Sequence, residues 1–319
     1  MTVMSKPILV VGSINLDLVA VTPRIPVSGE TVLGTSFHTF SGGKGANQAF
    51  AAARLGASVS MLGKVGNDAF GPQLHGSLQA AGVDTSAIEE VATSSGIAQI
   101  VTAANGENII VVVPGANAHL LPADLDRHIE LIRRAGIILA QLEIPMDTVS
   151  YLAALARKEN IPLMLDPAPA QPLPQSLLAA VDWLTPNESE ACTLLGIAVQ
   201  ELRAMQLQDI ANSLLQQGAR NVVLKLGGRG CYLALADGRR TLVPAFEVSA
   251  VDTTAAGDAF NGAFALSLME GKDAIQSASW ASAVAAISVT RAGAQPSMPT
   301  RTEVEQFLNE RHEKRASTH

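Results

Sequence analysis

The sequence is poor in several residue types, and each shortage excludes a class of protein. Aromatic residues make up 4% of the 319 residues, so the interior must be built from aliphatic side chains. The two cysteines, Cys192 and Cys231, are too few for a disulfide scaffold and lack metal-site spacing, which favours a reduced, cytoplasmic setting. Charged residues account for only 16%, and the formal net charge of −7 argues against a nucleic-acid-binding surface.

Long apolar runs are also missing, and none approaches the roughly 20 residues that span a bilayer. The Ala-rich segment 274–289 is broken by serines and predicts a buried helix. The first seven residues are too short and polar for a signal peptide, so we expect no membrane association. Hydrophobic residues nevertheless reach 48%, enough for a sizeable core.

Short apolar runs alternate with helix-length segments along most of the chain. The runs are continuous, which is typical of strands covered by helices on both faces of a parallel sheet. Strands are expected at 8–12, 59–63, 136–142, 162–166, 183–185 and 221–226, and helices at 46–55, 123–134, 147–159 and 209–217. This order predicts an α/β fold, a three-layer αβα sandwich with a mostly parallel central sheet. We expect residues 1–319 to form a single domain with a flexible polar tail at 311–319.

Two regions interrupt the alternation and predict a small projecting β-sheet, formed by about 15–39 and 96–115. Residues 96–113 resemble two strands around Asn105-Gly106, a strong hairpin signal, and 30–37 resembles a further extended stretch. The sheet would expose apolar side chains such as Ile109 and Val111, which need a substrate or a second subunit as cover. An ordinary antiparallel edge of the main sheet is the alternative.

The segment 252–263, DTTAAGDAFNGA, carries the strongest chemical signal. It follows a strand-like stretch at 248–251 and opens a helix expected at 258–269. Small residues at 255–257 let a ligand approach amides at a helix N-terminus, where anions are favoured. Asp258, in the first turn, could accept a proton from a hydroxyl while those amides hold a phosphoryl group. The simpler interpretation is an N-cap aspartate after a small-residue turn.

Other polar and glycine-rich segments favour a binding site. The turn SGGKGANQA at 41–49 also enters a helix, although it lacks the spacing of a P-loop. Polar residues follow three strands, where ligands bind in open α/β sheets, although each alone could be a cap or a surface residue. They are Asn15 and Asp17, then Glu143, then Asn187 and Glu190. The turn KLGGRG at 225–230 could be a simple hairpin or a backbone wall beside a nucleotide.

Taken together, these segments resemble the ribokinase-like (PfkB) carbohydrate kinase family. The N-terminal Gly-Gly motif at 42–49, the N-x-x-E motif at 187–190 and the D-T-x-x-A-G-D motif at 252–258 occur in the family's order and span nearly the whole chain. The segments 12–17, 167–170 and 291–297 are most similar to members that phosphorylate ribose. The resemblance implies transfer of the γ-phosphate of ATP to O5 of D-ribose, with Asp258 as the base.

The resemblance also implies the ligands of each site residue. The sugar would be bound by Asn15, Asp17, Gly43, Lys44, Asn47, Glu143 and Asp258. ATP would be bound by Asn187, Lys225, Gly227, Gly228, Gly230, Ala256, Gly257 and Ser282. Glu190 would help order Mg²⁺ through water, and an activating K⁺ would bind at Asp252, Thr254, Ser288, Arg291, Gly293 and Ser297. A homodimer that pairs the two small sheets is implied as well.

Two positions depart from the family pattern. Ala255 stands where glycine is common, so we expect its backbone to keep an ordinary conformation with negative φ. Lys225 stands where many ribose-phosphorylating members have threonine, so its ammonium could touch a phosphate or extend to solvent.

Alternative functions remain open at this point. A kinase for 2-deoxyribose, another sugar or a nucleoside would keep the same fold, but the polar residues favour a sugar and the scarcity of aromatics disfavours a stacked base. A non-catalytic sugar sensor would have lost the base or the glycines, and neither is lost. A dinucleotide-binding oxidoreductase is disfavoured because no G-x-G-x-x-G follows the first strand.

Overall fold

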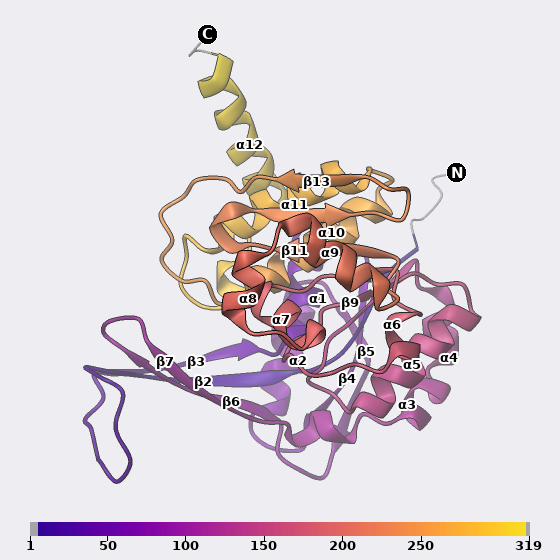
Figure 1. Ribbon diagram of the computed structural model, residues 1–319. Helices are drawn as coiled ribbons and strands as arrows, with labels where there is room; N and C mark the ends of the chain where they lie inside the picture. The colour runs from indigo at the N-terminus through magenta and orange to yellow at the C-terminus, as the bar shows by residue number, and fades with distance from the viewer. Residues whose placement is uncertain (1–5, 317–319) are drawn as a thin grey trace.

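The computed structural model describes residues 6–316, and the side chains of residues 6–311. Its centre is a nine-stranded sheet in which seven strands are parallel and the last two, at one edge, are antiparallel (Figure 1). From that edge the order is β13 (Arg240–Val243), β12 (Cys231–Ala234), β11 (Asn221–Lys225), β10 (Trp183–Leu184), β9 (Leu163–Leu165), β8 (Ile137–Ala140), β1 (Ile8–Val11), β4 (Val59–Gly66) and β5 (Asp84–Val91). The predicted mostly parallel sheet is confirmed.

Helices cover both faces of this sheet. One layer contains α1 (Lys44–Arg54), α2 (Gly71–Ala80), α10 (Ala256–Met269) and α11 (Ala274–Ser288), with α12 (Arg301–Ala316) packed beside them and then leading away from the body. The other contains α3 (Pro122–Arg127), α4 (Ile129–Arg134), α5 (Met146–Lys158), α6 (Gln175–Leu178), α7 (Glu188–Leu195), α8 (Val199–Ala204) and α9 (Leu207–Gln216). The predicted αβα sandwich is therefore confirmed.

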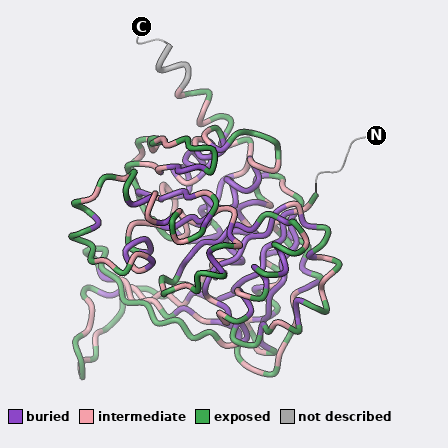
Figure 2. The backbone as a smooth tube through the Cα atoms, turned by 45° about the vertical axis from the view of Figure 1, so that its right-hand side comes forward, coloured by how far each residue is buried: buried purple, intermediate pink, exposed green. Residues whose placement is uncertain are grey.

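Strand β1 shows why the predicted runs are continuously apolar. Ile8 and Val10 belong to the hydrophobic cluster under α1 and α10, whereas Leu9 and Val11 belong to the cluster under α5. Successive side chains of a strand point to opposite faces, so a strand with two covered faces needs apolar residues at every position. Figure 2 shows this interior as a continuous buried band.

A separate four-stranded sheet projects from the main body. Its order is β3 (Ser36–Gly42), β2 (Asn15–Thr22), β6 (Gly96–Ala103) and β7 (Asn108–Val113), with β2 and β6 parallel. The hairpin around Asn105-Gly106 is present between β6 and β7. The bounds of the extended stretch expected at 30–37 are wrong, because the strand begins at Ser36 and the residues before it form a loop. Strand β2, which contains Asn15 and Asp17, lies within the stretch 15–39 assigned to the small sheet, although its own bounds were not predicted.

The edge strand β7 is exposed over its whole length. Its apolar residues Ile109 to Val113 are all β-branched, and each is between 44% and 57% exposed. A flat, apolar and unpaired strand edge is a surface that proteins normally cover. Figure 2 accordingly colours most of the projecting part of the small sheet as exposed or intermediate.

Several smaller expectations need correction. The stretch 248–251 is not a strand, and the helix expected at 123–134 is two helices that meet at His128. Residues 311–316 of the expected tail continue helix α12, and 317–319 lie outside the described residues. Within the described part of the chain, every helix is too short or too polar to cross a bilayer.

Candidate active site

The carboxyl ends of the central parallel strands and the N-termini of two helices converge on one region. Glu143 follows β8, Asp166 follows β9, Asn187 follows β10 and Lys225 ends β11. Helices α1 and α10 pack against each other and begin at this same edge. In an open α/β sheet this is where ligands bind, and helix N-termini add unpaired amides that favour anions.

Asp258 lies in the first turn of α10 and is 5% exposed. Its Oδ2 accepts a hydrogen bond from Asn47 Nδ2 at 3.1 Å, and its Oδ1 accepts one from Gln48 Nε2 at 3.1 Å. These two amide donors come from the first turns of α1 and fix the plane of the carboxylate. Each oxygen keeps a lone pair for a further donor, such as a substrate hydroxyl.

Burial raises the pKa of Asp258 to about 6, with a further contribution from the negative charge of Asp166. Lys44 and the two amide donors act in the opposite direction. The carboxylate is therefore ionised at neutral pH, while remaining more basic than an exposed aspartate. A value near the working pH is what a general base requires.

A polar cluster lies on the side of Asp258 that faces the small sheet. Glu143 Oε2 accepts hydrogen bonds from Ser13 Oγ at 2.5 Å, from the Lys44 backbone N at 3.1 Å and from Asn15 Nδ2 at 3.4 Å. Asp17 lies two residues after Asn15 on the same strand. Burial, together with the negative charges of Glu143 and Asp258, raises its pKa to about 7. The cluster offers both donors and acceptors, which suits a molecule with several hydroxyl groups.

Gly43 forms the turn that brings α1 to this cluster. Its φ is +88°, and a Cβ there would lie 2.6 Å from the backbone N of Asn15. Only glycine fits this conformation and this close approach. All seven residues predicted to contact the sugar lie on β2, in the first turns of α1 and α10, or directly after β8. Their role as sugar ligands stays a prediction.

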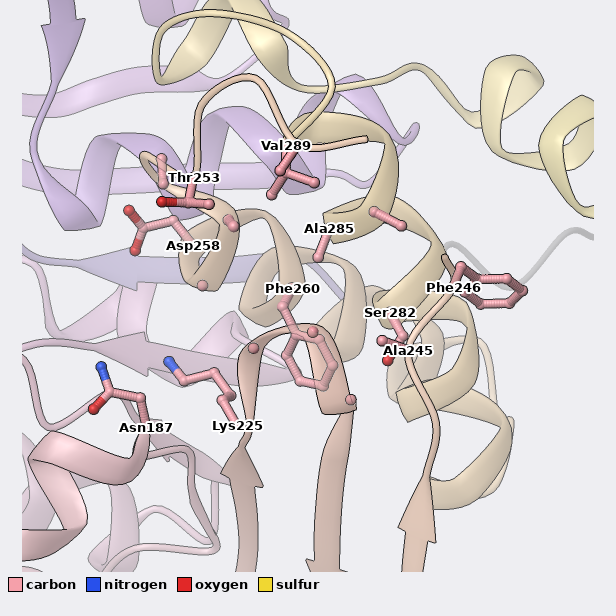
Figure 3. Close-up of a pocket in the computed structure, with 18 of the residues that line it drawn as sticks. Asn187, Lys225, Ala245, Phe246, Thr253, Asp258, Phe260, Ser282, Ala285 and Val289 are labelled. Atoms are coloured by element: carbon pink, nitrogen blue, oxygen red, sulfur yellow. The ribbon is translucent and has the colours of Figure 1, made fainter. Parts of the chain in front are cut away.

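A pocket of about 620 Å³ opens on the other side of Asp258 (Figure 3). This volume suits a ligand of the size of a nucleotide. All eight residues predicted to contact ATP line it: Asn187, Lys225, Gly227, Gly228, Gly230, Ala256, Gly257 and Ser282. The pocket is lined by apolar side chains that include Phe246, Ala285 and Val289, and by the charged residues Lys44 and Asp258. Figure 3 shows Phe246 at the end away from Asp258.

Asn187 and Glu190 form a reciprocal capping box at the start of α7. Glu190 N donates to Asn187 Oδ1 at 2.8 Å, and Glu190 accepts from the backbone N and the side-chain Nδ2 of Asn187 at 2.8 and 2.7 Å. The structural interpretation of this motif is therefore correct. Each Glu190 oxygen retains a lone pair and the residue lines the pocket, so it also fits a carboxylate that orders the waters of Mg²⁺.

The six residues predicted to bind K⁺ belong to two segments that meet beside the start of α10. Asp252 Oδ1 accepts from Thr254 N at 2.9 Å and Asp252 Oδ2 accepts from Gly293 N at 2.8 Å. Val289 O accepts from the backbone N of Val251 and of Asp252. Ser288 and Ser297 donate their hydroxyls to nearby carbonyls, and the Arg291 guanidinium pairs with Glu303. A carboxylate and backbone carbonyls are hard oxygen donors, which fit a monovalent cation.

Sequence reasoning missed the residues that support Asp258 from behind. Asp166 accepts from Gln48 Nε2 at 3.0 Å and from Lys225 Nζ at 2.9 Å, and Gln141 Nε2 donates to Gln48 Oε1 at 2.8 Å. Asn117 Nδ2 donates to Asn15 Oδ1 at 2.7 Å. Asp166 is the last residue of the strand predicted at 162–166 and directly follows β9 in the structure, so a search for polar residues at strand ends could have found it. Gln48, Gln141 and Asn117 carry no comparable signal.

Ala255 contradicts its sequence prediction. Its φ is +58° and ψ is +12°, so it lies in the left-handed region that we expected it to avoid. Such a conformation costs an L-residue about 1–2 kcal/mol and persists where the surroundings impose it, often at functional sites. Here the left-handed N-cap turns the chain from the Asp252 loop into α10. Ala256 N donates to Thr253 O at 3.3 Å, whereas the amides of Gly257 and Asp258 have no hydrogen-bond partner among the described residues and can bind a ligand.

Replacing Ala255 with glycine should therefore stabilise the protein. We expect A255G to raise the free energy of unfolding by about 0.5 kcal/mol, because relief of strain exceeds the extra freedom of glycine in the unfolded chain. Urea denaturation measures the change. N160G is the matched control: Asn160 is exposed with φ of +55°, and asparagine tolerates that conformation better than alanine, so its gain should be smaller. A loss of more than about 1 kcal/mol in A255G would contradict the strain argument.

The chemistry that this geometry permits is transfer of a phosphoryl group to a hydroxyl. A buried base, free helix-terminal amides, the cationic Lys44 and a nucleotide-sized pocket meet at one point. Phosphoryl transfer requires this combination of positioning and charge neutralisation rather than a covalent intermediate.

Comparisons with known proteins agree with this chemistry. The family described as "pfkB family carbohydrate kinase" matches residues 5–301. The chain is 44% identical over 306 residues to the ribokinase of Bacillus subtilis (strain 168), covering 95% of this chain and 100% of that protein. It is 38% identical over 304 residues to the deoxyribokinase of Salmonella typhi, covering 95% and 98% of the two chains.

A solved structure shows the same architecture. The ribokinase of Arabidopsis thaliana complexed with ribose and ATP superposes with a TM-score of 0.88 at 34% identity, covering 96% of this chain and 99% of that one. The resemblance inferred from the Gly-Gly and D-T-x-x-A-G-D motifs is thus confirmed. The chain belongs to the pfkB family of carbohydrate kinases, and it is a phosphotransferase that acts on an alcohol group.

Proposed function

We propose that this protein transfers the γ-phosphate of ATP to O5 of D-ribose, giving D-ribose 5-phosphate and ADP. The observation that carries the proposal is the position of Asp258. It lies between the polar cluster of Asn15, Asp17 and Glu143 and a pocket of about 620 Å³, in the first turn of α10, where the amides of Gly257 and Asp258 have no hydrogen-bond partner among the described residues. The relatives named ribokinase and the complex with ribose and ATP support the same choice of substrates.

In this mechanism Asp258 accepts the proton of the attacking hydroxyl. Asn47 and Gln48 hold its carboxylate in place, so the oxygen that receives the proton is preoriented. The amides of residues 255–258 bind the transferring group and stabilise its developing charge. Lys44 lines the pocket beside Asp258; burial lowers its pKa, but Asp258, Asp166 and Glu143 raise it further, so it stays cationic. Mg²⁺, with Glu190 ordering its waters, would supply charge neutralisation at the β- and γ-phosphates.

The sugar rather than a nucleoside is favoured by the polar cluster. Asn15, Asp17 and Glu143 present amide and carboxylate groups toward the space beside Asp258, and these groups suit hydroxyls rather than a flat base. The discrimination between ribose and 2-deoxyribose rests on a single hydroxyl, and the similarity to a deoxyribokinase keeps 2-deoxyribose as the second candidate. A non-catalytic sugar sensor is disfavoured because the base, Lys44 and the free amides are all retained.

The loop that precedes α10 supports the proposal of an activating K⁺. The carboxylate of Asp252 is half-buried and links this loop to Gly293, whose backbone N donates to it at 2.8 Å. A bound cation there would brace the strained turn at Ala255 and so the amides that follow. The proposed setting is the cytoplasm, where thiols such as Cys192 stay reduced.

We further propose that the small sheet is a lid over the sugar and that two copies pair through it. Strand β2 supplies Asn15 and Asp17, so movement of the sheet would move sugar ligands and exclude water. All six residues of the edge strand β7 are exposed, and five of them, Ile109 to Val113, are apolar. Pairing with the lid of a second copy would cover that edge.

An ADP-release assay tests the substrate. We expect turnover with D-ribose to exceed that with 2-deoxyribose, fructose and adenosine, because the cluster around Asp17 matches a polyhydroxylated pentose. Rates should rise when K⁺ is added and should disappear when Mg²⁺ is chelated. Absence of turnover with D-ribose would reject the proposed substrate without affecting the family.

Substitution of the base tests the mechanism. D258N should lower kcat by roughly 10²–10⁴-fold, because the amide cannot accept the proton of the attacking hydroxyl. Binding of D-ribose, measured by calorimetry, should largely survive because Asn15, Asp17 and Glu143 are unchanged. A variant that keeps near-full kcat would rule out Asp258 as the base.

Charge placed on the lid edge tests the dimer. Multi-angle light scattering should show a dimer at micromolar concentration for the unaltered protein and a monomer for V111E. L242E is the matched control, because Leu242 is 49% exposed on β13, the edge strand of the main sheet, and Val111 is 57% exposed. A monomeric unaltered protein, or a dimer that V111E leaves intact, would contradict pairing through the lid.

A further inference from the structure

Lys225 and Asp166 form a nearly buried ion pair directly behind the base. Lys225 Nζ lies 2.9 Å from Asp166 Oδ1, and the two side chains are 14% and 3% exposed. Figure 3 shows Lys225 extending from the end of β11 with its ammonium directed into the pocket, near Asn187 and below Asp258. A Cβ built on Gly257 would lie 3.3 Å from this ammonium, so the cation also stands next to the amides at the start of α10.

The pair is joined to the base through one amide group. Gln48 Nε2 donates to Asp166 Oδ2 at 3.0 Å and to Asp258 Oδ1 at 3.1 Å. Because both oxygens accept from the same nitrogen, they lie at most about 6 Å apart, close enough for strong repulsion between like charges. Gln141 Nε2 holds the other end of Gln48 at 2.8 Å and thereby fixes which of its atoms faces the two acids.

The burial of these groups makes the charge balance important. A carboxylate that loses its cation in such a place is left uncompensated, and its field acts on any neighbouring carboxylate. Lys225 engages Asp166 on the side away from Gln48, so it neutralises the acid nearest to the base without competing for Gln48. Burying this ion pair costs desolvation free energy, and a contact between apolar side chains of similar size would avoid that cost.

We propose that Lys225 and Asp166 act as one positioning unit that, through Gln48, sets the orientation and the protonation of the base Asp258. Neither residue reacts with the substrate in this role. The inference rests on the proposed role of Asp258 as the base, and it assigns a function to the lysine that departs from the family pattern.

Four other charged residues surround Asp258, and the variants described below leave all four unchanged. Lys44 approaches from α1, Asp17 from β2, Glu143 from the segment after β8 and Glu190 from α7. Burial and Asp166 raise the pKa of Asp258, and Lys44 lowers it. Removing Lys225 exposes the full charge of Asp166 to the base, whereas removing the charge of Asp166 leaves the base facing an unopposed cation.

The experiment is a double-mutant cycle on the pH dependence of kcat/KM. The unaltered enzyme should lose activity as the pH falls through about 6, the pKa of Asp258. K225T should move this acidic limb to higher pH by about one unit, and D166N should move it to lower pH by a similar amount. The double variant K225T/D166N should return the limb to within about 0.3 unit of the original, because it removes both charges.

R220Q is the matched control. Arg220 precedes β11 at its opposite end and pairs with Asp182 at 3.5 Å, so its loss removes one positive charge from the same strand without contact to Gln48. Its acidic limb should not move. Circular dichroism and thermal melting check that each variant folds, and the double variant keeps the test informative if one single variant is unstable.

Other outcomes would overturn the proposal. If K225T and the double variant both raise KM for ATP equally and leave the limb in place, Lys225 is a phosphate ligand that acts independently of Asp166. If all variants lower kcat with no change in pH dependence, the pair is only structural. Titration of Asp258 by ¹³C NMR in the ligand-free protein needs no substrate, so it separates failure of this inference from failure of the proposed sugar.

Discussion

The concentration of negative charge around Asp258 is the constraint on which the rest of the site depends. Asp17, Glu143, Asp166 and Glu190 all surround it in a partly buried space, and the ligand proposed for the adjacent pocket is a polyanion. Lys44 and Lys225 are the cations that line the site among the described residues. Repulsion of this size would expel either the base or a phosphate if it were not offset by fixed donors and cations.

The fold supplies those compensating groups from elements far apart in the sequence. The side-chain amides of Asn47 and Gln48 on α1 hold Asp258, while Gly257 and Asp258, at the start of α10, line the pocket. Both helices begin at the carboxyl edge of the sheet, the edge at which ligands bind in open α/β sheets. The positive ends of two helix dipoles therefore meet where the acids meet. The mostly parallel topology therefore determines where the acids and the compensating groups of the site lie.

Most of this site could be predicted from local sequence. Glycine-rich turns before helices, and polar residues after continuous apolar runs, are signals that depend only on neighbouring residues. They identified Asn15, Glu143, Asn187 and Asp258, and the structure brings these residues to one edge of the sheet. The same reasoning located the hairpin of the small sheet through Asn105-Gly106, where φ of Gly106 is +86°.

The parts that could not be predicted depend on contacts between distant segments. Gln48, Gln141 and Asn117 are amides inside ordinary helical or strand-end sequence, and only their partners, 93 to 210 residues away, give them a role. The strain at Ala255 was missed for a related reason. Local propensity favours negative φ for alanine, whereas the Asp252 loop and its bonds to Gly293 impose the left-handed turn from outside. The bounds of strand β2 were not predicted because its partners β3 and β6 are supplied by later parts of the chain.

The ion pair behind the base follows the same logic, because Lys225 acquires its role only from Asp166, a distant residue in the sequence. A buried lysine beside Asp166 costs desolvation and brings little net stability, so stability alone does not account for it. An aspartate at 166 is compatible with a nearby base only if a cation accompanies it, because the two acids share a donor on Gln48. The identity of residue 225 is therefore tied to that of residue 166, more than 50 positions earlier. A neutral side chain at 225 would leave the carboxylate of Asp166 uncompensated beside Asp258, whereas the lysine that this chain carries neutralises it.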